Sequence, residues 1–128
     1  MDEAHLKRGI TEFNRGYFFE AHDILEDLWM DTSGKDKLFL QGLIQVSVGF
    51  YHYFNSNYKG AVSQFSKGLA KLEAYLPAHC NVELEEFTEK VSVWRDAARA
   101  GLIGESVFVD ESKVPRIILA ESSGQKEF

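Results

Sequence analysis

A run of 17 residues without a charged side chain, from Leu38 to Phe54, constrains the fold more than any other feature. Its apolar residues continue nearly all round a helix, which is typical of a helix enclosed by others. Seventeen residues are at the short limit for crossing a bilayer, and the run contains the polar residues Gln41, Gln45 and His52. It therefore predicts the central helix of a bundle, in contact with the helices before and after it, and argues against a membrane span.

The segments on both sides of this run also have helical periodicity, and turn residues separate them. Gly16 is placed to end the first segment, polar residues at 31–34 separate the second from the third, and Pro77 ends the fourth. Asn81 is a candidate N-cap for the fifth. The sequence therefore predicts five helices, near residues 2–14, 17–30, 35–54, 58–75 and 82–100.

The predicted fold class is all-α, a compact antiparallel helical bundle of about five helices with a less regular C-terminal tail. A length of 128 residues, 45% of them hydrophobic, is enough for one packed core. We expect one domain over residues 1–120 and a flexible tail over 121–128. Within the last part of the domain, residues 107–109 and 117–119 are apolar and look extended, so we expect them to pack on the bundle.

Charge and cysteine content exclude several classes of function. The formal net charge is −6, and the 14 basic residues are scattered along the chain rather than clustered. Binding to nucleic acid needs a basic footprint, so we expect no such partner. Cys80 is the only cysteine, which excludes an intrachain disulfide and a cluster of zinc thiolates and fits a reduced, cytoplasmic setting. The N-terminal residues lack the apolar core of a signal peptide.

The segment from residue 13 to residue 29 contains the main functional clue. On a helix, His22 and Glu26 fall within the same arc as Phe18, Leu25 and Trp29. An ionisable pair among apolar side chains is costly unless it is paired, hydrogen-bonded or bound to a ligand. We therefore expect both side chains to be largely buried, with a polar partner on the neighbouring helix.

Three interpretations of this pair remain open. In the first interpretation, His22 and Glu26 belong to a closed hydrogen-bond network with Gln41 or Gln45, which Trp29 covers and which binds no ligand. Alternatively, the same residues line a pocket for a small organic or peptide ligand.

The third interpretation is a metal centre. In this interpretation, His22 and Glu26, which are one helical turn apart, bind a divalent metal together with His52 as the third ligand. Antiparallel packing counts against this set, because His52 lies about 10 Å beyond Gln45 along the helix axis. Gln41, Gln45 and His52 share a strip of their helix with two glycines, at 42 and 49, where a neighbouring backbone can come close.

Three sequence segments are similar to those of a known family of bacterial and archaeal proteins. The segments are FNRGYFFEAHDILEDLW at 13–29, QGLIQVSVGFYH at 41–52 and NYKGA at 57–61. They resemble domain of unknown function 309, whose pattern also has Phe, Asn and Gly at 13, 14 and 16 and Glu, His and Glu at 20, 22 and 26. Asp23 stands where the family usually has Glu. The resemblance covers about the first half of the chain and implies a small all-helical protein, of a kind often labelled a predicted metal-dependent hydrolase.

Two classes of function follow. The first is a module that binds a small molecule or a protein partner through the pocket residues His22, Glu26, Trp29, Gln41, Gln45 and His52. The second is a metal-dependent hydrolase in which the metal activates a water and Glu26 or Glu20 serves as base or ligand. We favour the first, because no complete catalytic set can be assembled, and homo-oligomers remain possible under both. His5 and His79 are expected to be ordinary surface histidines.

Overall fold

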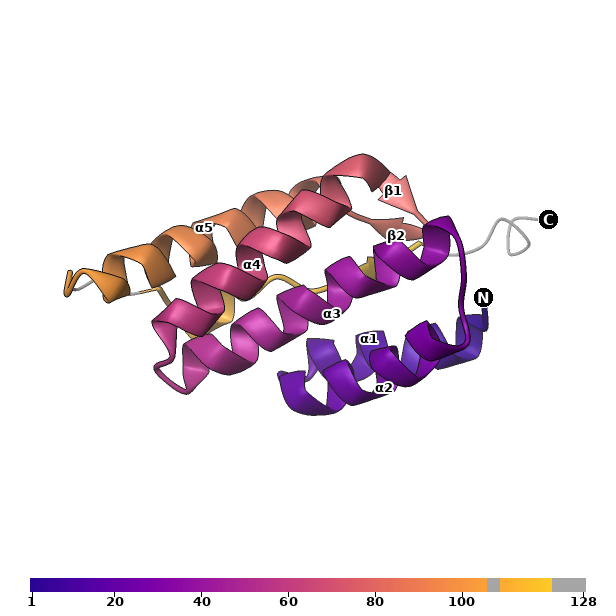
Figure 1. Ribbon diagram of the computed structural model, residues 1–128, viewed down its shortest axis with the longest axis horizontal. Coiled ribbons are helices and arrows are strands. Elements are labelled where there is room, and N and C mark those ends of the chain that lie inside the picture. The colour runs from indigo at the N-terminus through magenta and orange to yellow at the C-terminus, as the bar shows by residue number, and fades with distance from the viewer. Residues whose placement is uncertain (106–108, 121–128) are drawn as a thin grey trace.

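The computed structural model describes residues 1–105 and 109–120. Most of this part of the chain is helical, as Figure 1 shows, which confirms the expected class. A small antiparallel sheet and two short 3₁₀ turns, η1 and η2, are added to the bundle. The expected tail at 121–128, and the first two residues of the apolar run at 107–109, lie outside the described residues. The elements are α1 (Glu3–Asn14), α2 (Phe18–Met30), α3 (Lys35–Phe54), α4 (Tyr58–Leu72), η1 (Glu73–Tyr75), β1 (Ala78–His79), β2 (Val82–Glu83), α5 (Glu85–Leu102), η2 (Glu111–Lys113) and β3 (Ile118–Leu119).

Helix α3 lies in the middle of the fold, as its uncharged surface predicts. It contacts α2 on one side and α4 on the other, and α5 packs on α4 (Figure 1). The ring of Phe50 in α3 is the centre of an aromatic core, and its centroid lies 4.8–5.8 Å from rings of all four other α-helices. These rings belong to Phe13, Phe18, Phe65 and Trp94.

Two glycines bring α3 and α4 into close contact. A Cβ atom added to Gly68 would lie 2.9 Å from the carbonyl oxygen of Gly42, which is closer than real Cβ atoms come to backbone. A Cβ atom added to Gly42 would lie 2.8 Å from the side chain of Leu72. The strip of α3 that contains Gly42 and Gly49 therefore faces α4. The polar residues on the same strip are consequently expected to face α4 as well.

The chain between α4 and α5 differs from the prediction. Residues 78–83 form a β-hairpin, and α5 begins at Glu85 instead of near residue 82. The two hairpin-turn residues, Cys80 and Asn81, have φ values of 51° and 63°, as a two-residue type I′ turn requires. Asn81 therefore serves the turn and is not a helix N-cap. Sequence periodicity missed the hairpin because each of its strands is only two residues long.

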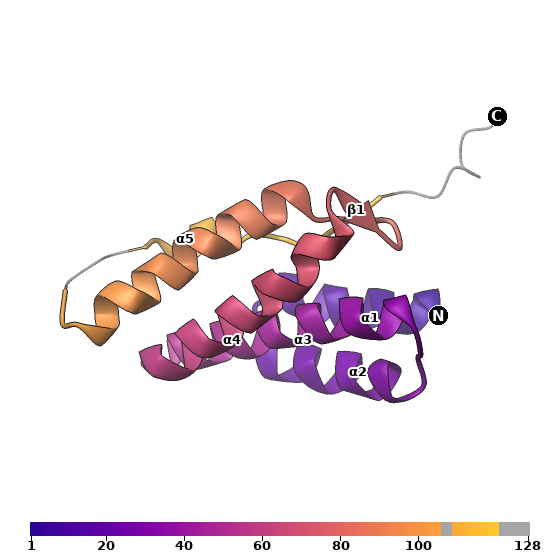
Figure 2. The same cartoon turned by 45° about the horizontal axis from the view of Figure 1, so that its top comes forward.

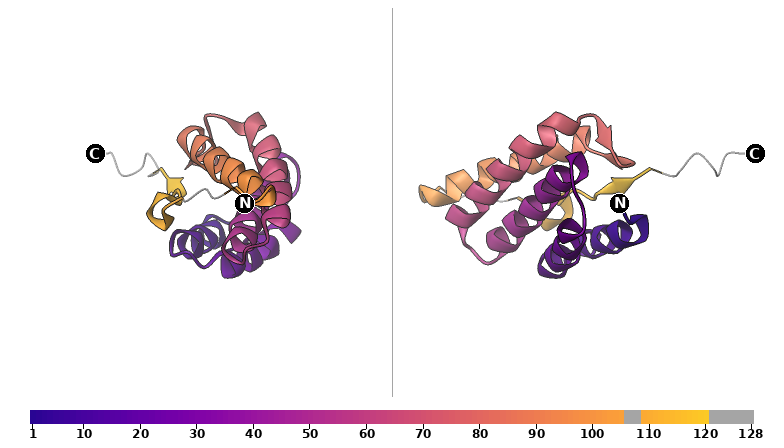
Figure 3. Two further views of the ribbon diagram at one scale, coloured as in Figure 1. Left: turned by 90° about the vertical axis from the view of Figure 1, so that its left-hand side faces the viewer. Right: turned by 45° about the vertical axis from the view of Figure 1, so that its right-hand side comes forward.

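After α5, the segment of residues 109–119 runs back along the bundle and contacts both α5 and β2. Figures 2 and 3 show it in yellow, between α5 and α1, on its way to β3. The indole nitrogen of Trp94 donates a hydrogen bond to the carbonyl of Lys113, and Ile117 is buried. β3 pairs with β2, which confirms the extended conformation expected near residues 117–119.

Among the described residues, no helix combines the length and apolar character needed to cross a membrane.

Candidate functional site

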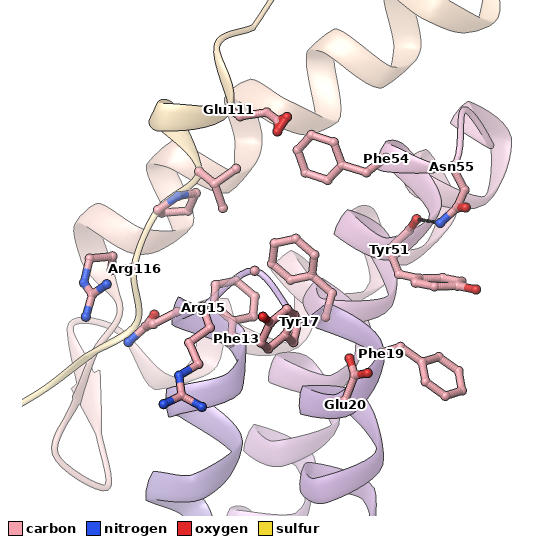
Figure 4. Close-up of a pocket in the computed structure, with 15 residues that line it drawn as sticks. Phe13, Arg15, Tyr17, Phe19, Glu20, Tyr51, Phe54, Asn55, Glu111 and Arg116 are labelled. Carbon is pink, nitrogen blue, oxygen red and sulfur yellow. Dashed lines mark hydrogen bonds between the residues drawn. The ribbon is translucent and has the colours of Figure 1, made fainter.

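A groove of about 790 Å³ opens at the end of the bundle where α1 turns into α2 and where α3 ends (Figure 4). Three segments far apart in sequence form its walls: residues 13–20, residues 51–55 and residues 111–116. Its volume lies in the range of sites that bind small molecules or peptide side chains. The groove is therefore the first candidate for a functional site.

Exposed aromatic side chains surround this groove. Tyr17, Phe19, Tyr51 and Phe54 are each 40–55% exposed, although large apolar side chains are usually buried. The rings of Phe19 and Tyr51 lie 5.5 Å apart, and Phe54 stacks on the buried ring of Phe18 at 6.0 Å. A cluster of this kind on the surface is typical of an interaction site.

The tight turn between α1 and α2 places these rings. Gly16 has a φ of 84°, a conformation that residues with a Cβ atom rarely adopt. Its amide donates to the carbonyl of Phe13, and the amide of Tyr17 donates to the carbonyl of Glu12. These two bonds end α1 and reverse the chain, so Tyr17 and Phe19 emerge at the groove.

The groove carries charges of both signs. Arg15 and Arg116 lie on one side of it in Figure 4, whereas Glu20 and Glu111 lie along the other edges. Arg15 also forms an exposed ion pair with Glu12, at 3.1 Å. Glu20, a possible catalytic residue predicted from the sequence, lies at the groove. The groove therefore offers partners for carboxylates and for cations.

The predicted pair of His22 and Glu26 forms, but its environment differs from the prediction. Nε2 of His22 lies 3.7 Å from a carboxylate oxygen of Glu26. The side chain of His22 is 22% exposed and that of Glu26 is 51% exposed, so the expected burial of Glu26 is wrong. Phe19 and Met30 of the same helix are also exposed, so the buried arc of α2 is narrower than the sequence predicts.

One nitrogen of His22 lacks a well-formed hydrogen bond. Nδ1 lies 3.3 Å from a carboxylate oxygen of Asp23, yet this buried nitrogen has no partner with hydrogen-bond geometry among the described residues. We regard the contact as electrostatic, because its distance is short but its angle is unfavourable. The ring of Phe19 lies 5.8 Å from that of His22, so the histidine adjoins the groove.

Two other predicted members of the cluster, Gln45 and His52, face α4 and not α2. Gln45 accepts a hydrogen bond from Nζ of Lys71 at 3.0 Å, and Nδ1 of His52 lies 3.3 Å from the amide nitrogen of Asn57. Gln41 is half-buried on the same helix. Among the described residues, no hydrogen bond joins either glutamine to His22 or Glu26. The glycines at 42 and 49 allow α4 to pack closely against this strip of α3, so Gln45 and His52, which share the strip, also face α4.

Trp29 is half-buried and packs against the edge of the core. Nζ of Lys37 lies 4.0 Å from the centroid of its ring and also donates to its carbonyl oxygen. The indole nitrogen is buried and finds no hydrogen-bond partner within the described part of the chain. Trp29 thus contacts Lys37 at the start of α3, and among the described residues no hydrogen bond joins its indole to Gln41 or Gln45.

The residues predicted as metal ligands do not make a three-ligand centre. His22 and Glu26 supply two ligands, and His52, the expected third, is turned toward Asn57 and α4. A catalytic zinc site in a protein generally has three protein ligands. Across residues 1–105 and 109–120, three potential ligands come together only elsewhere, at Asp36, His79 and Cys80.

This second cluster lies where α3 begins, at the tip of the β-hairpin. Nε2 of His79 is 2.8 Å from a carboxylate oxygen of Asp36, and the thiol of Cys80 lies 3.5 Å from the same oxygen. The hydrogen bond from His79 holds the pKa of the Asp36 carboxyl below its usual value. Burial, followed by the neighbouring Asp36, raises the pKa of the Cys80 thiol to about 11.

Sequence reasoning missed this cluster. His79 was expected at the surface and is half-buried, as is His5, whose Nε2 lies 2.9 Å from the carbonyl oxygen of Ile24. Asp36 and His79 are 43 residues apart, and no helical or strand period connects them. The adjacent His79 and Cys80 were the only available signal, and two potential ligands in a row are common without any function.

Known proteins are similar to this chain in its N-terminal half, which contains the motif segments. The model of the family described as "Domain of unknown function (DUF309)" matches residues 6–64. The uncharacterized protein YpuF of Bacillus subtilis (strain 168) is 36% identical over 58 residues, which make up 44% of this chain and 33% of that protein. The match thus spans a third of that relative's length. Two of the three groove walls fall inside the matched segment, and the resemblance is confirmed: residues 6–64 of this chain match the model of domain of unknown function 309.

Proposed function

We propose that this protein is a binding module and that its groove holds a short, extended segment of a protein partner. The observation that carries the proposal is the gathering of four exposed aromatic side chains at one cavity built from three distant segments. Tyr17, Phe19, Tyr51 and Phe54 offer flat apolar faces at little cost in conformational entropy. Such rings are typical anchors for an apolar or aromatic side chain of a partner.

The charges of the groove favour a peptide over a small apolar molecule. Arg15 and Arg116 present guanidinium groups that match carboxylates, whereas Glu20 and Glu111 match basic side chains. A peptide with an apolar anchor between charged residues meets all of these groups at once. The groove is also open to solvent, whereas a small-molecule site usually encloses most of its ligand.

We also infer a cytoplasmic setting and one binding domain over residues 1–120. The single, half-buried cysteine supports the first. The contacts of residues 109–119 with the bundle support the second.

The alternative function is a metal-dependent hydrolase that uses His22 and Glu26. One feature favours it, the buried Nδ1 of His22, which lacks a hydrogen-bond partner among the described residues. The pair supplies two ligands where a hydrolytic centre generally has three from the protein. For this reason the hydrolase remains the second candidate.

The proposal is tested by selecting binders from a random peptide library displayed on phage, with the full chain as bait. Chemical-shift changes caused by the selected peptides in the ¹⁵N-labelled protein should map to residues 13–20, 51–55 and 111–116. Tyr17→Ala should weaken their affinity by about tenfold or more, as loss of an aromatic anchor does. Leu38→Ala, which truncates an apolar side chain of similar exposure on another face, should leave the affinity unchanged.

Two results would contradict the proposal. One is peptide binding that maps outside the groove or responds equally to both alanine substitutions. The other is hydrolysis of an ester or phosphoester substrate that requires an added divalent metal and is lost in Glu26→Gln but kept in Tyr17→Ala, which would support the alternative function.

A further inference from the structure

Three side chains of different ligand type converge at the end of the bundle opposite the groove. Asp36 lies in the first turn of α3, His79 in β1 and Cys80 in the hairpin turn. One ligand atom from each lies within 4.8 Å of the other two. Figure 1 shows the hairpin beside the start of α3. The groove lies near the other end of α3, and at the usual rise per residue Asp36 and Tyr51 are about 22 Å apart along the helix axis.

From this arrangement we propose that Asp36, His79 and Cys80 bind a zinc ion, with solvent as the fourth ligand. Thiolate, imidazole and carboxylate are the three ligand types that zinc takes in proteins, whereas calcium and magnesium prefer oxygen alone. Three protein ligands leave one position of a tetrahedron open. The half-buried state of all three residues leaves room for that solvent ligand.

The distances are close to those of a metal centre. In a tetrahedral zinc site, neighbouring ligand atoms lie about 3.3–3.8 Å apart, given the usual bond lengths. The thiol of Cys80 is 3.5 Å from the Asp36 oxygen, which already falls in this range. The imidazole of His79 is 2.8 Å from that oxygen, so it needs to move away by about half an ångström to admit the ion.

Packing fixes the orientation of the His79 ring. Its centroid lies 4.9 Å from that of Phe39 and 4.7 Å from that of Tyr75. The hydroxyl of Tyr75 donates to the carbonyl of Lys35, which ties this wall to the start of α3. Such support around a histidine ligand keeps its nitrogen directed at the metal and raises affinity.

Cavities on both sides of the cluster give an ion access to it. One of about 380 Å³ is lined by His79 together with Tyr75 and Lys35. Another of about 380 Å³ is lined by Cys80 and Asn81 and lies against the start of α1. Solvent therefore reaches the imidazole and the thiol without any opening of the bundle.

The competing explanation is that the Asp36–His79 hydrogen bond only holds the hairpin against α3. Isothermal titration of the metal-free, reduced protein with zinc chloride separates the two. We expect about one zinc per chain, and weakening by at least about tenfold in each of Asp36→Asn, His79→Gln and Cys80→Ser, because a lost ligand costs no less than a lost supporting group. His22→Gln and Glu26→Gln are the matched controls and should bind zinc as the unsubstituted protein does.

Cobalt provides a readout that a structural role would not give. The Co²⁺ form should show a thiolate-to-cobalt charge-transfer band in the near ultraviolet that disappears in Cys80→Ser and in Cys80→Ala. Circular dichroism melts of each metal-free variant show whether it folds, and two cysteine substitutions guard against a folding defect in one. The proposal is overturned if zinc does not bind, if the three ligand variants bind it undiminished, or if His22→Gln is the variant that loses it.

Discussion

Asn14 and Ile117 are joined by a pair of hydrogen bonds across 103 residues of sequence. The amide nitrogen of the Asn14 side chain donates to the carbonyl of Ile117 at 3.0 Å, and the backbone nitrogen of Ile117 donates to the Asn14 side-chain oxygen at 2.7 Å. One side chain thus satisfies both backbone groups of a residue in the returning segment. Because residues 111–116 form the third wall of the groove, this pair of bonds holds the groove together.

Asn14→Ala should therefore loosen the returning segment. Both backbone groups of Ile117 lose their partner, and the expected loss in unfolding free energy is about 1–3 kcal/mol. Urea denaturation measures this loss, and hydrogen exchange should become faster at the amides of residues 109–120. Asn55→Ala is the control, because its amide makes one exposed bond within its own helix end. Equal losses of unfolding free energy in the two variants would show that the Asn14–Ile117 hydrogen bonds contribute no more than one exposed hydrogen bond.

Leu43→Ala should destabilise the protein by about 2–5 kcal/mol, as for other fully buried leucines. Leu43 is completely buried in α3, between the helices that flank it. Leu38, in the same helix, is 52% exposed, so Leu38→Ala should change the unfolding free energy by less than about 1 kcal/mol. Chemical denaturation of both variants checks the placement of α3, and a reversed order would contradict it.

Gly68→Ala should force α3 and α4 apart. The new Cβ atom would meet backbone, the carbonyl oxygen of Gly42, and no flexible side chain can move to relieve the contact. We expect a loss of about 1–3 kcal/mol in spite of the better helix propensity of alanine. Ser63→Ala, at an exposed position of α4, is the matched control and should be neutral or slightly stabilising. A gain in thermal stability for Gly68→Ala would mean that the two helices pack less closely than described.

Alkylation of Cys80 by iodoacetamide should be slow at pH 8 in the metal-free protein. The raised pKa, about 11, keeps the thiol protonated, and only the thiolate reacts. Compared with a cysteine of ordinary pKa, 9.0, the thiolate fraction is lower by about 100-fold at this pH. The rate should rise with pH until about pH 11. The same residue in denaturant is the control, and fast labelling of the native state at pH 8 would contradict the described environment.

The course of the helices could be predicted from the sequence, because periodicity and turn residues act locally. The uncharged run of α3 indicated its central place, and Gly16 marked the end of α1. Orientation about the helix axis was harder to predict. Gln45 and His52 were expected to face α2, but the direction of a strip on an enclosed helix depends on which neighbour approaches closest, and that is a property of the whole packing.

Part of the candidate site could also be predicted from the sequence, and part of it could not. Tyr17, Phe19 and Tyr51 lie in or beside the family motif, although the sequence predicts a pocket around His22 and its neighbours. The wall that contains Arg116, and the meeting of Asp36 with His79, depend on contacts between residues 43 to 103 positions apart. No periodicity in a single sequence encodes contacts at such a distance.

The pairing of Asn14 with Ile117 also has a consequence for the order of folding. The hairpins α1–α2 and α3–α4 bury neighbouring stretches of chain, and contacts of this kind form fast. During synthesis both hairpins can assemble before residue 117 has left the ribosome, but the third wall of the groove cannot. A nascent chain stopped before that point has its aromatic core helices and lacks a complete groove. Under the proposed function, binding of a partner peptide would therefore begin only after residues 111–117 have been synthesised.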